Sequence, residues 1–276
     1  MKISRSALFV RRTKTDKGDS RVEKFGEEIS GLLQFLKSND LEVGIASWHL
    51  TNYLVFLFVA CVVMLVVTLV ARRKSSLIPK GRFYNLIEML VDFVRSDVAV
   101  ANIGPEGKRY FPFLGTVFFF ILINNLIGTL PGGKPGTGTM GVTVALALCA
   151  FVMFNGAGMR KRGVGGYIKG LVPHGVPGIL WPVIWVIEVI SLLIRPFTLS
   201  IRLFANMFAG HLLIATFSIA AFYLLSASII GILGSAASFT VAIGLTAFEM
   251  LIQALQAYIF TLLAAVYISG ALHAEH

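Results

Sequence analysis

Beyond residue 48 the chain alternates between long apolar runs and short loops that hold most of its charge. A helix needs about 20 apolar residues to cross the hydrocarbon core of a bilayer. Runs of that length predict an all-α integral membrane protein with about five membrane-spanning helices. Their expected ranges are 50–71, 110–130, 140–158, from Pro182 past residue 215, and 238–269. The last two are longer than a perpendicular crossing needs, which predicts either steep tilt or a course partly inside the plane of the bilayer.

A helix of another kind is predicted after the first span. From Phe83 onward, apolar residues recur at helical spacing, whereas Glu88, Asp92 and Arg95 take the opposite face. This pattern predicts an amphipathic helix that lies along the membrane surface or against a neighbouring helix.

The same pattern divides the chain into two parts. Residues 1–47 are mixed in charge and lack long apolar runs, so we expect an N-terminal tail or surface segment and assign it no activity. Residues 48–276 are predicted to form one membrane domain, in which 178–270 is a hairpin of the last two helices. Glycine and proline at 163–182 predict an irregular connection before the hairpin, and small residues at 231–235 predict its turn.

Basic residues gather in two loops beside apolar spans. One loop follows the first span, at 72–74, and the other follows the third span, at 160–162. Positively charged loops usually face the cytoplasm, so both are predicted on that side. The loop that follows the second span carries only Lys134 up to residue 139 and is predicted on the outer side.

Composition indicates that lipid is the main solvent, because 56% of the residues are hydrophobic and only 14% are charged. A net charge of +10 would make nucleic acid a candidate partner of a soluble protein, but here the loop positions explain it and no nucleic acid is expected. Cys61 and Cys149 lie far apart within apolar segments, which predicts buried thiols and no metal site. No phosphate-binding loop or nucleophile triad occurs, so we expect no cofactor.

The most informative residues are polar and lie where the membrane core is expected. Arg202 stands in the run RPFTLSIRLFANMFAGH, and an arginine at bilayer depth costs about 2.5–3.5 kcal/mol on insertion scales. One alternative is that Arg202 reaches lipid phosphate or backbone carbonyls, as arginines near helix ends do. Its central position favours a functional role. Because a guanidinium stays protonated, Arg202 can act as a fixed charge but not as a proton carrier.

Further polar residues follow Arg202 in the helical pattern. Asn206 lies one turn away on nearly the same face, where both side chains would face a partner, whereas His211 projects toward the helix behind. His211 and an acid of the final helix could pass protons through water, or they could form a static hydrogen bond that locks the helix pair. The final helix carries a polar stripe of Thr246, Glu249, Gln253 and Gln256, extended by Ser238 and Tyr267.

The residues alone leave several alternatives open. Glu188 lies nearer the basic loops and is predicted either to be a second water-exposed site or to pair with Arg195. A stand-alone secondary transporter or channel would also place ionic groups near the midplane, but the two halves of the chain show no internal repeat. An assembly scaffold, in which Arg202 only pairs with an acid of a partner, is the third class.

Three motifs carry a resemblance to a known family. SIRLFANMFAGH, FEMLIQALQAYIFTLL and NNLIGTLPG resemble subunit a of the F-type ATP synthase, over about residues 48–272. By motif, Arg202 matches the family's essential arginine, Asn206 its channel asparagine and Gln256 its final-helix glutamine. His211 and Glu249 match a pair that some bacterial members carry in the opposite order, and Glu188 matches a family acid on the cytoplasmic side.

The resemblance implies a stationary, non-catalytic subunit that provides two offset half-channels to a rotating ring of c subunits. Protons would enter through Asn206, His211, Glu249 and Gln256, with Gln253 beside them, and would leave past Glu188. Arg202 would separate the two paths and favour deprotonation of the arriving ring carboxylate. The implied partners are the c-ring, the b subunits of the peripheral stalk, membrane lipid and, indirectly, the F1 sector. A bacterial plasma membrane is expected, with a mitochondrial or chloroplast membrane as the alternative.

Overall fold

The computed structural model describes residues 40–41, 50–73, 81–130, 133–172, 177, 179–225 and 229–273. Almost all of them are helical, apart from a two-residue antiparallel pairing of β1 (Asp40–Leu41) with β2 (Leu50–Thr51). Residues 1–39 and 42–47 of the predicted tail lie outside the described residues. The helices are α2 (Asn52–Arg73), α3 (Arg82–Phe93), the π-helix η1 (Val94–Val100), α4 (Ala101–Ile103), α5 (Gly107–Gly128), the 3-10 turn η2 (Gly136–Gly138), α6 (Met140–Lys169), α7 (Trp181–Leu225) and α8 (Ile229–His273).

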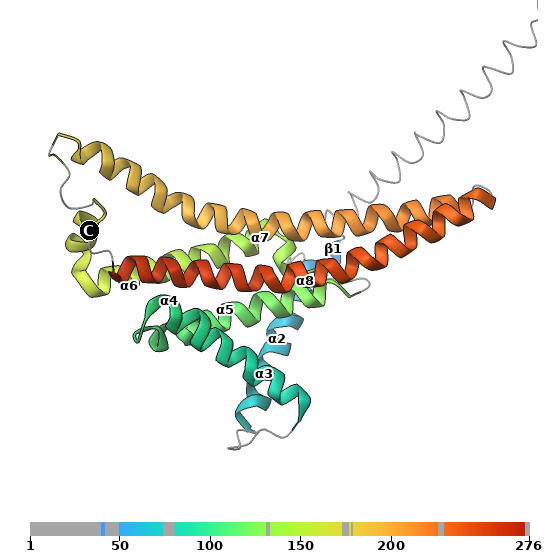
Figure 1. Cartoon of the computed structure of the whole chain (residues 1–276), viewed down its shortest axis with the longest axis horizontal. Coiled ribbons are helices and arrows are strands. Elements are labelled where there is room, and N and C mark those ends of the chain that lie inside the picture. The colour runs from blue at the N-terminus through green and yellow to red at the C-terminus, as the bar shows by residue number, and fades with distance from the viewer. Residues whose placement is uncertain are drawn as a thin grey trace, which may run out of the picture.

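Four of these helices, α5 to α8, are long and apolar enough to cross a membrane, and α2 adds a shorter apolar stretch at Tyr53–Leu69. The prediction of an all-α integral membrane protein is therefore confirmed. α7 and α8 contain 45 residues each and run side by side along the length of the molecule (Figure 1). Each is about 68 Å long at the usual rise per residue, more than twice the thickness of the hydrocarbon core.

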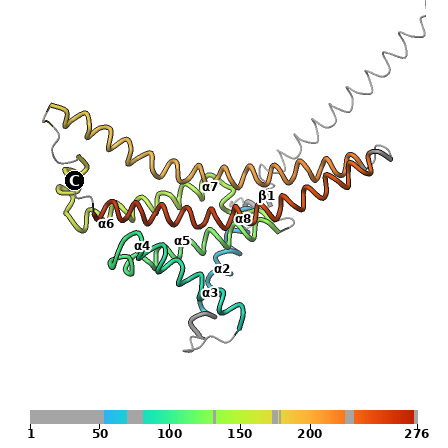
Figure 2. Tube along the Cα trace, in the orientation of Figure 1, coloured from blue at the N-terminus to red at the C-terminus, as the bar shows by residue number. Residues whose placement is uncertain are grey.

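The direction of α2 differs from that of the long helices. α2 packs against α5 and crosses the line of α7 and α8 at a steep angle (Figure 2). With 22 residues, α2 has about the length of a perpendicular crossing. If α2 stands across the bilayer, the two long helices lie strongly inclined within it, as their length requires.

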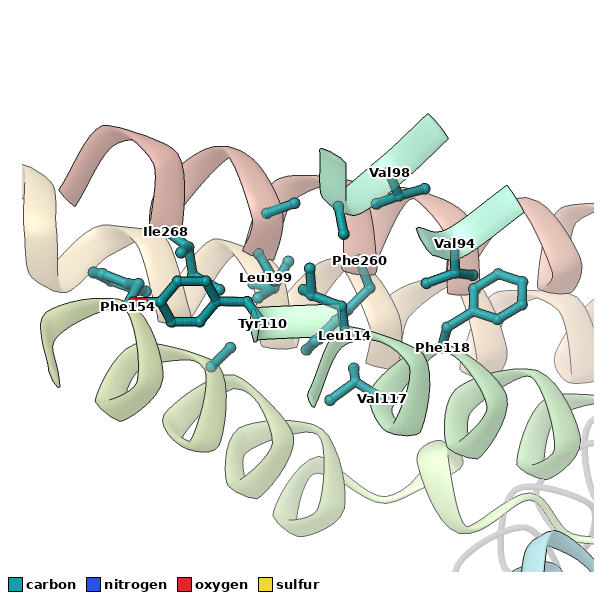
Figure 3. Packing of buried hydrophobic residues seen from close by; sticks show 14 of the residues in the cluster. Val94, Val98, Tyr110, Leu114, Val117, Phe118, Phe154, Leu199, Phe260 and Ile268 are labelled. Atoms are coloured by element: carbon teal, nitrogen blue, oxygen red, sulfur yellow. The ribbon is translucent and has the colours of Figure 1, made fainter. Parts of the chain in front are cut away.

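An apolar core holds α5, α6, α7 and α8 together with η1. Tyr110 and Leu114 of α5 and Phe154 of α6 belong to it, and all three are buried. Figure 3 shows these side chains gathered with Leu199 of α7 and with Phe260 and Ile268 of α8. The core thus fixes the last two helices against the rest of the bundle.

The amphipathic helix is present as α3, and no residue of it is fully buried. Its acids Glu88 and Asp92 are exposed, whereas Leu90 and Phe93 pack against the core, so the end of α3 lies against neighbouring helices. At Val94 the helix changes to the π-helix η1, which the spacing did not predict. A π-helix adds one residue per turn.

One of two predicted breaks is wrong in position. The turn expected at 231–235 lies inside α8, because α7 ends at Leu225 and α8 begins at Ile229. A Cβ atom on Gly234 would lie 3.2 Å from the side chain of Leu224, so the small residue there serves close packing of the two helices. The break expected from residue 163 is present at Gly163, whose φ of 73° and ψ of 159° divide α6 into two helical parts, and the second part continues to Lys169.

The prediction that both cysteines are buried is also wrong. Cys61 and Cys149 are free and exposed on the surface of the chain. An apolar segment of a membrane protein can face lipid as well as the protein core, so hydrophobic surroundings in the sequence do not distinguish the two.

Candidate functional site

Polar side chains of α7 and α8 meet at two levels. At the first level the Asn206 amide nitrogen donates a hydrogen bond of 2.7 Å to Oε1 of Gln256. Asn206 is exposed, whereas Gln256 is only 2% exposed. The helical spacing predicted that Asn206 faces outward together with Arg202. In the structure the amide of Asn206 also contacts α8.

At the second level His211 of α7 lies beside Glu249 of α8. The Nδ1 atom of His211 is 3.8 Å from Oε1 of Glu249, which is too long for a hydrogen bond. Glu249 is buried, and a Cβ atom on Gly210 would lie 2.6 Å from its carboxyl oxygen. A glycine at 210 thus allows this carboxyl group to lie directly against the backbone of α7.

Several polar atoms at these two levels are buried without a hydrogen-bond partner among the described residues: Nε2 of His211, Oε2 of Glu249 and Nε2 of Gln256. Native cores satisfy most buried polar groups, so an exception calls for an explanation. The static hydrogen bond between His211 and Glu249, one of the two alternatives drawn from the sequence, is absent in this structure.

Gln253 connects this region to α5. Its amide nitrogen donates a hydrogen bond of 3.1 Å to Oε1 of Glu249, and its Oε1 atom accepts one of 2.9 Å from the hydroxyl of Thr129. Its backbone carbonyl faces the amide of Asn125 at 3.4 Å. The carbonyl of the Asn125 side chain accepts a hydrogen bond of 2.7 Å from the hydroxyl of Thr137, in η2. A continuous polar connection therefore joins Thr137 to Glu249.

Sequence reasoning did not single out Asn125, Thr129 or Thr137 as members of this site. The available signal was the asparagine pair in NNLIGTLPG, within an otherwise apolar helix. Asn124 and Asn125 are both buried, and only a tertiary contact distinguishes them. Asn124 donates to Phe120 of its own helix, whereas Asn125 contacts α8 and η2.

Arg202 lies on the exposed surface of α7. Within the described part of the chain its guanidinium makes no hydrogen bond and no ion pair, so it does not bind backbone carbonyls of these residues. The next residue, Leu203, is completely buried in the core. The core therefore fixes the helix while the charge at Arg202 points away from the bundle.

The remaining candidate, Glu188, lies 14 residues before Arg202 on α7 and is partly exposed. It forms no ion pair with Arg195 in the structure, so that alternative is wrong. The guanidinium of Arg195 lies instead 5.3 Å from the centre of the Tyr267 ring, in a cation–π contact with α8. Among the residues that the structure describes, no three His, Cys, Asp or Glu side chains could hold a metal ion.

Fold and site together define a polytopic membrane protein that buries a carboxyl group, an imidazole and amides between its last two helices. The family model described as ATP synthase A chain matches residues 54–269. ATP synthase subunit a of Myxococcus xanthus is 39% identical over 263 residues, which cover 93% of this chain and 80% of the relative. The corresponding subunit of Frankia alni is 41% identical over 248 residues, 86% of this chain and 83% of the relative. That of Hyphomonas neptunium is 38% identical over 236 residues, 86% of this chain and 92% of the relative.

The chain belongs to the ATP synthase subunit a family. The resemblance seen in the sequence is thus confirmed, and the stand-alone transporter is not favoured. Subunit a is the proton-translocating component of the membrane sector, works within the complex of the membrane and F1 sectors, and is not an enzyme by itself.

Proposed function

We propose that this chain passes protons through two offset half-channels to a carboxylate of a c-subunit ring, with Arg202 as the fixed charge between the two paths. One observation carries the proposal. Arg202 is exposed on α7, unpaired within the described residues, and one turn from Asn206, whose amide leads inward to the buried Gln256. A permanent cation at this depth favours an acid of another protein as its neighbour.

The polar connection from η2 to Glu249 supports an entry path on the outer side. Thr137 lies in the loop that is predicted on the outer side, and Asn125 and Gln253 link it to Glu249. From Glu249 the next polar groups are His211 at 3.8 Å and, one level further, the Asn206–Gln256 pair. Buried polar atoms without partners destabilise a static core, but a proton path requires groups that can change partners.

Glu188 is the proposed exit site. It lies near the start of α7, which follows the basic end of α6 predicted on the cytoplasmic side. The 14 residues that separate Glu188 from Arg202 correspond to roughly 21 Å along the helix. Arg202 therefore stands between the proposed entry residues and the proposed exit residue.

The chemistry of Arg202 follows from its charge. A guanidinium close to a carboxylate favours the deprotonated form, so the arriving ring carboxylate would release its proton toward the exit. The same charge repels a proton that would pass directly from one half-channel to the other. Each proton that crosses releases about 2.3 kcal/mol per 100 mV of membrane potential, and a direct leak would dissipate that energy.

The proposed partners are the c-ring, which supplies the moving carboxylate, the b subunits of the peripheral stalk, and the F1 sector through them. The proposed location is a bacterial plasma membrane, because the relatives described above come from bacteria. A mitochondrial or chloroplast membrane is the alternative.

The test is to replace Arg202 in the intact complex, reconstituted in vesicles. Arg202→Ala is expected to abolish ATP synthesis and to increase passive proton flux, because the barrier between the half-channels is lost. Arg202→Lys is the matched control, since it keeps the charge but not the planar fork, and should retain more of the barrier to passive flux than Arg202→Ala. Synthesis at the wild-type rate in Arg202→Ala would exclude the proposed mechanism.

A further inference from the structure

A groove lies between α5 and α6, away from the polar contacts of α7 and α8. Its volume is about 530 Å³, and its lining is mainly apolar. The side chains of Leu148 and Val152 are 51% and 68% exposed, so this wall of the groove faces out of the chain. The apolar part is lined by Phe113 of α5 and by Leu148, Cys149, Val152, Met153 and Gly156 of α6.

Two arginines line the same groove. Arg109 stands near the beginning of α5 and Arg160 in the second half of α6, and both are exposed. Neither guanidinium forms a hydrogen bond or an ion pair with the described residues. The nearby acid Glu106 forms an ion pair with Lys161, in which its Oε1 atom lies 3.3 Å from the ammonium nitrogen. The groove therefore combines an apolar wall with two positive charges that no carboxylate in the described chain neutralises.

The positions along the helices give the groove a direction. Arg160 and Leu148 are 12 residues apart on α6, which corresponds to roughly 18 Å. The arginines lie at the end that carries the basic residues 160–162, and this end is predicted on the cytoplasmic side. Charge at the level of the headgroups and apolar surface at the level of the tails is the arrangement of a phospholipid.

We propose that this groove binds an anionic phospholipid, with its phosphate between Arg109 and Arg160 and an acyl chain along the apolar wall. Guanidinium groups bind phosphate in a bidentate manner, and basic pockets between membrane helices on the cytoplasmic side bind anionic headgroups. The charges provide the selectivity, because an acyl chain is no more attracted to the groove than to surrounding lipid. An apolar helix of another subunit would instead bury both cations without an anion, which is unfavourable.

The first experiment compares two lipids in the purified, intact complex. Phosphatidylglycerol and phosphatidylcholine with the same photoactivatable acyl chain are added in turn, and the cross-linked peptides are identified by mass spectrometry. We expect phosphatidylglycerol to label the α6 segment 148–153 and phosphatidylcholine to label it several times less. Equal labelling by both lipids, or a cross-link from this segment to a helix of another subunit, would overturn the proposal.

The second experiment removes the charges. Arg109→Gln and Arg160→Gln should each weaken phosphatidylglycerol binding about fivefold, as expected for one cation near the surface. Lys169→Gln is the matched control, because it removes a cation from the part of α6 beyond the kink at Gly163, outside the groove, and should have no such effect. Unchanged labelling in the double variant R109Q/R160Q contradicts the proposal. If that variant does not assemble, R109K/R160K replaces it and should retain most of the labelling.

The two cysteines provide an independent readout without any variant. Cys149 lines the groove, whereas Cys61 lies on α2 outside it, and both are exposed. Phosphatidylglycerol should slow the reaction of Cys149 with a lipid-soluble maleimide severalfold and leave the reaction of Cys61 unchanged. Equal protection of both cysteines, or of neither, would count against a lipid in the groove.

Discussion

The contact between α7 and α8 consists of two regions that differ in chemistry. In one region Leu199 and Leu203 of α7 meet Phe260 and Ile268 of α8 in the apolar core, and all are at most 2% exposed. In the other region, at 249–256 of α8, the buried groups are a carboxyl and two amides, and two of their polar atoms, Oε2 of Glu249 and Nε2 of Gln256, have no partner among the described residues. Interhelical hydrogen bonds such as Asn206–Gln256 can hold a helix pair, but buried polar atoms without partners do not stabilise it, so these atoms require another explanation.

The difference teaches how one helix pair can be both rigid and conductive. The apolar region fixes the separation and rotation of the helices, which keeps the polar groups within a few ångströms of one another. The polar region then carries the groups that exchange protons. Substitutions in the two regions should therefore separate two quantities: proton flux per assembled complex, and the amount and stability of the complex.

The largest loss of flux is expected from Glu249→Gln. Glutamine keeps the size of the side chain and a hydrogen bond to Gln253, but it removes the carboxyl group that can take up and release a proton. Proton flux driven by ATP hydrolysis should fall by a factor of about 100, which is the lower end of the range for a lost acid–base group. Dye quenching in inverted vesicles measures the flux, and blue-native electrophoresis measures assembly. Proton flux at the wild-type level would show that the His211–Glu249 pair has a structural role and does not transfer protons.

A smaller loss is expected from Asn125→Leu. This change removes the contact with the Gln253 carbonyl, which keeps its bond within α8, and it leaves the buried Thr137 hydroxyl without its partner, at about 1–3 kcal/mol. Flux should decrease severalfold if the connection from η2 to Glu249 carries protons. Asn124→Leu is the matched control, because among the described residues the amide of Asn124 bonds only to Phe120 of its own helix. Equal effects of the two substitutions would show that packing, and not the polar connection, is responsible.

The smallest effect on flux is expected from Phe260→Ala, in the apolar region. The truncation should destabilise the assembled subunit by about 3–5 kcal/mol, the usual cost for a buried phenylalanine. The yield and the thermal stability of the complex should therefore fall. Flux per assembled complex should stay within about a factor of two, because no polar group is changed. A loss of flux as large as that of Glu249→Gln, at equal amounts of complex, would erase the distinction between the two regions.

Much of the fold could be predicted because lipid imposes strong constraints on the sequence. The apolar runs located α5, α6, α7 and α8, since a helix in lipid must satisfy its own backbone. Their ends were less well predicted. The small residues at 231–235 look like a turn but pack α8 against α7, and only the three-dimensional contact with Leu224 shows which role they have.

The candidate site was predictable to the extent that its groups are costly in lipid. Arg202, His211 and Glu249 stood out because charged and ionisable groups are rare at this depth. Asn125 and Thr137 were missed because amides and hydroxyls can bond within their own helix or turn, so their presence in the sequence indicates no particular partner. Their roles depend on the contact with α8, which involves residues 128 positions apart.

The direction of α2 has a consequence for the geometry of transport. If α2 stands across the bilayer, its steep angle to the long helices means that part of any distance along α7 lies in the plane of the membrane. The 18 residues from Glu188 to Asn206 cover roughly 27 Å, which would then include a sideways displacement. A proton delivered at one place could leave only after being carried laterally to the other. The inclination of two helices would thereby turn a vertical gradient into motion around an axis.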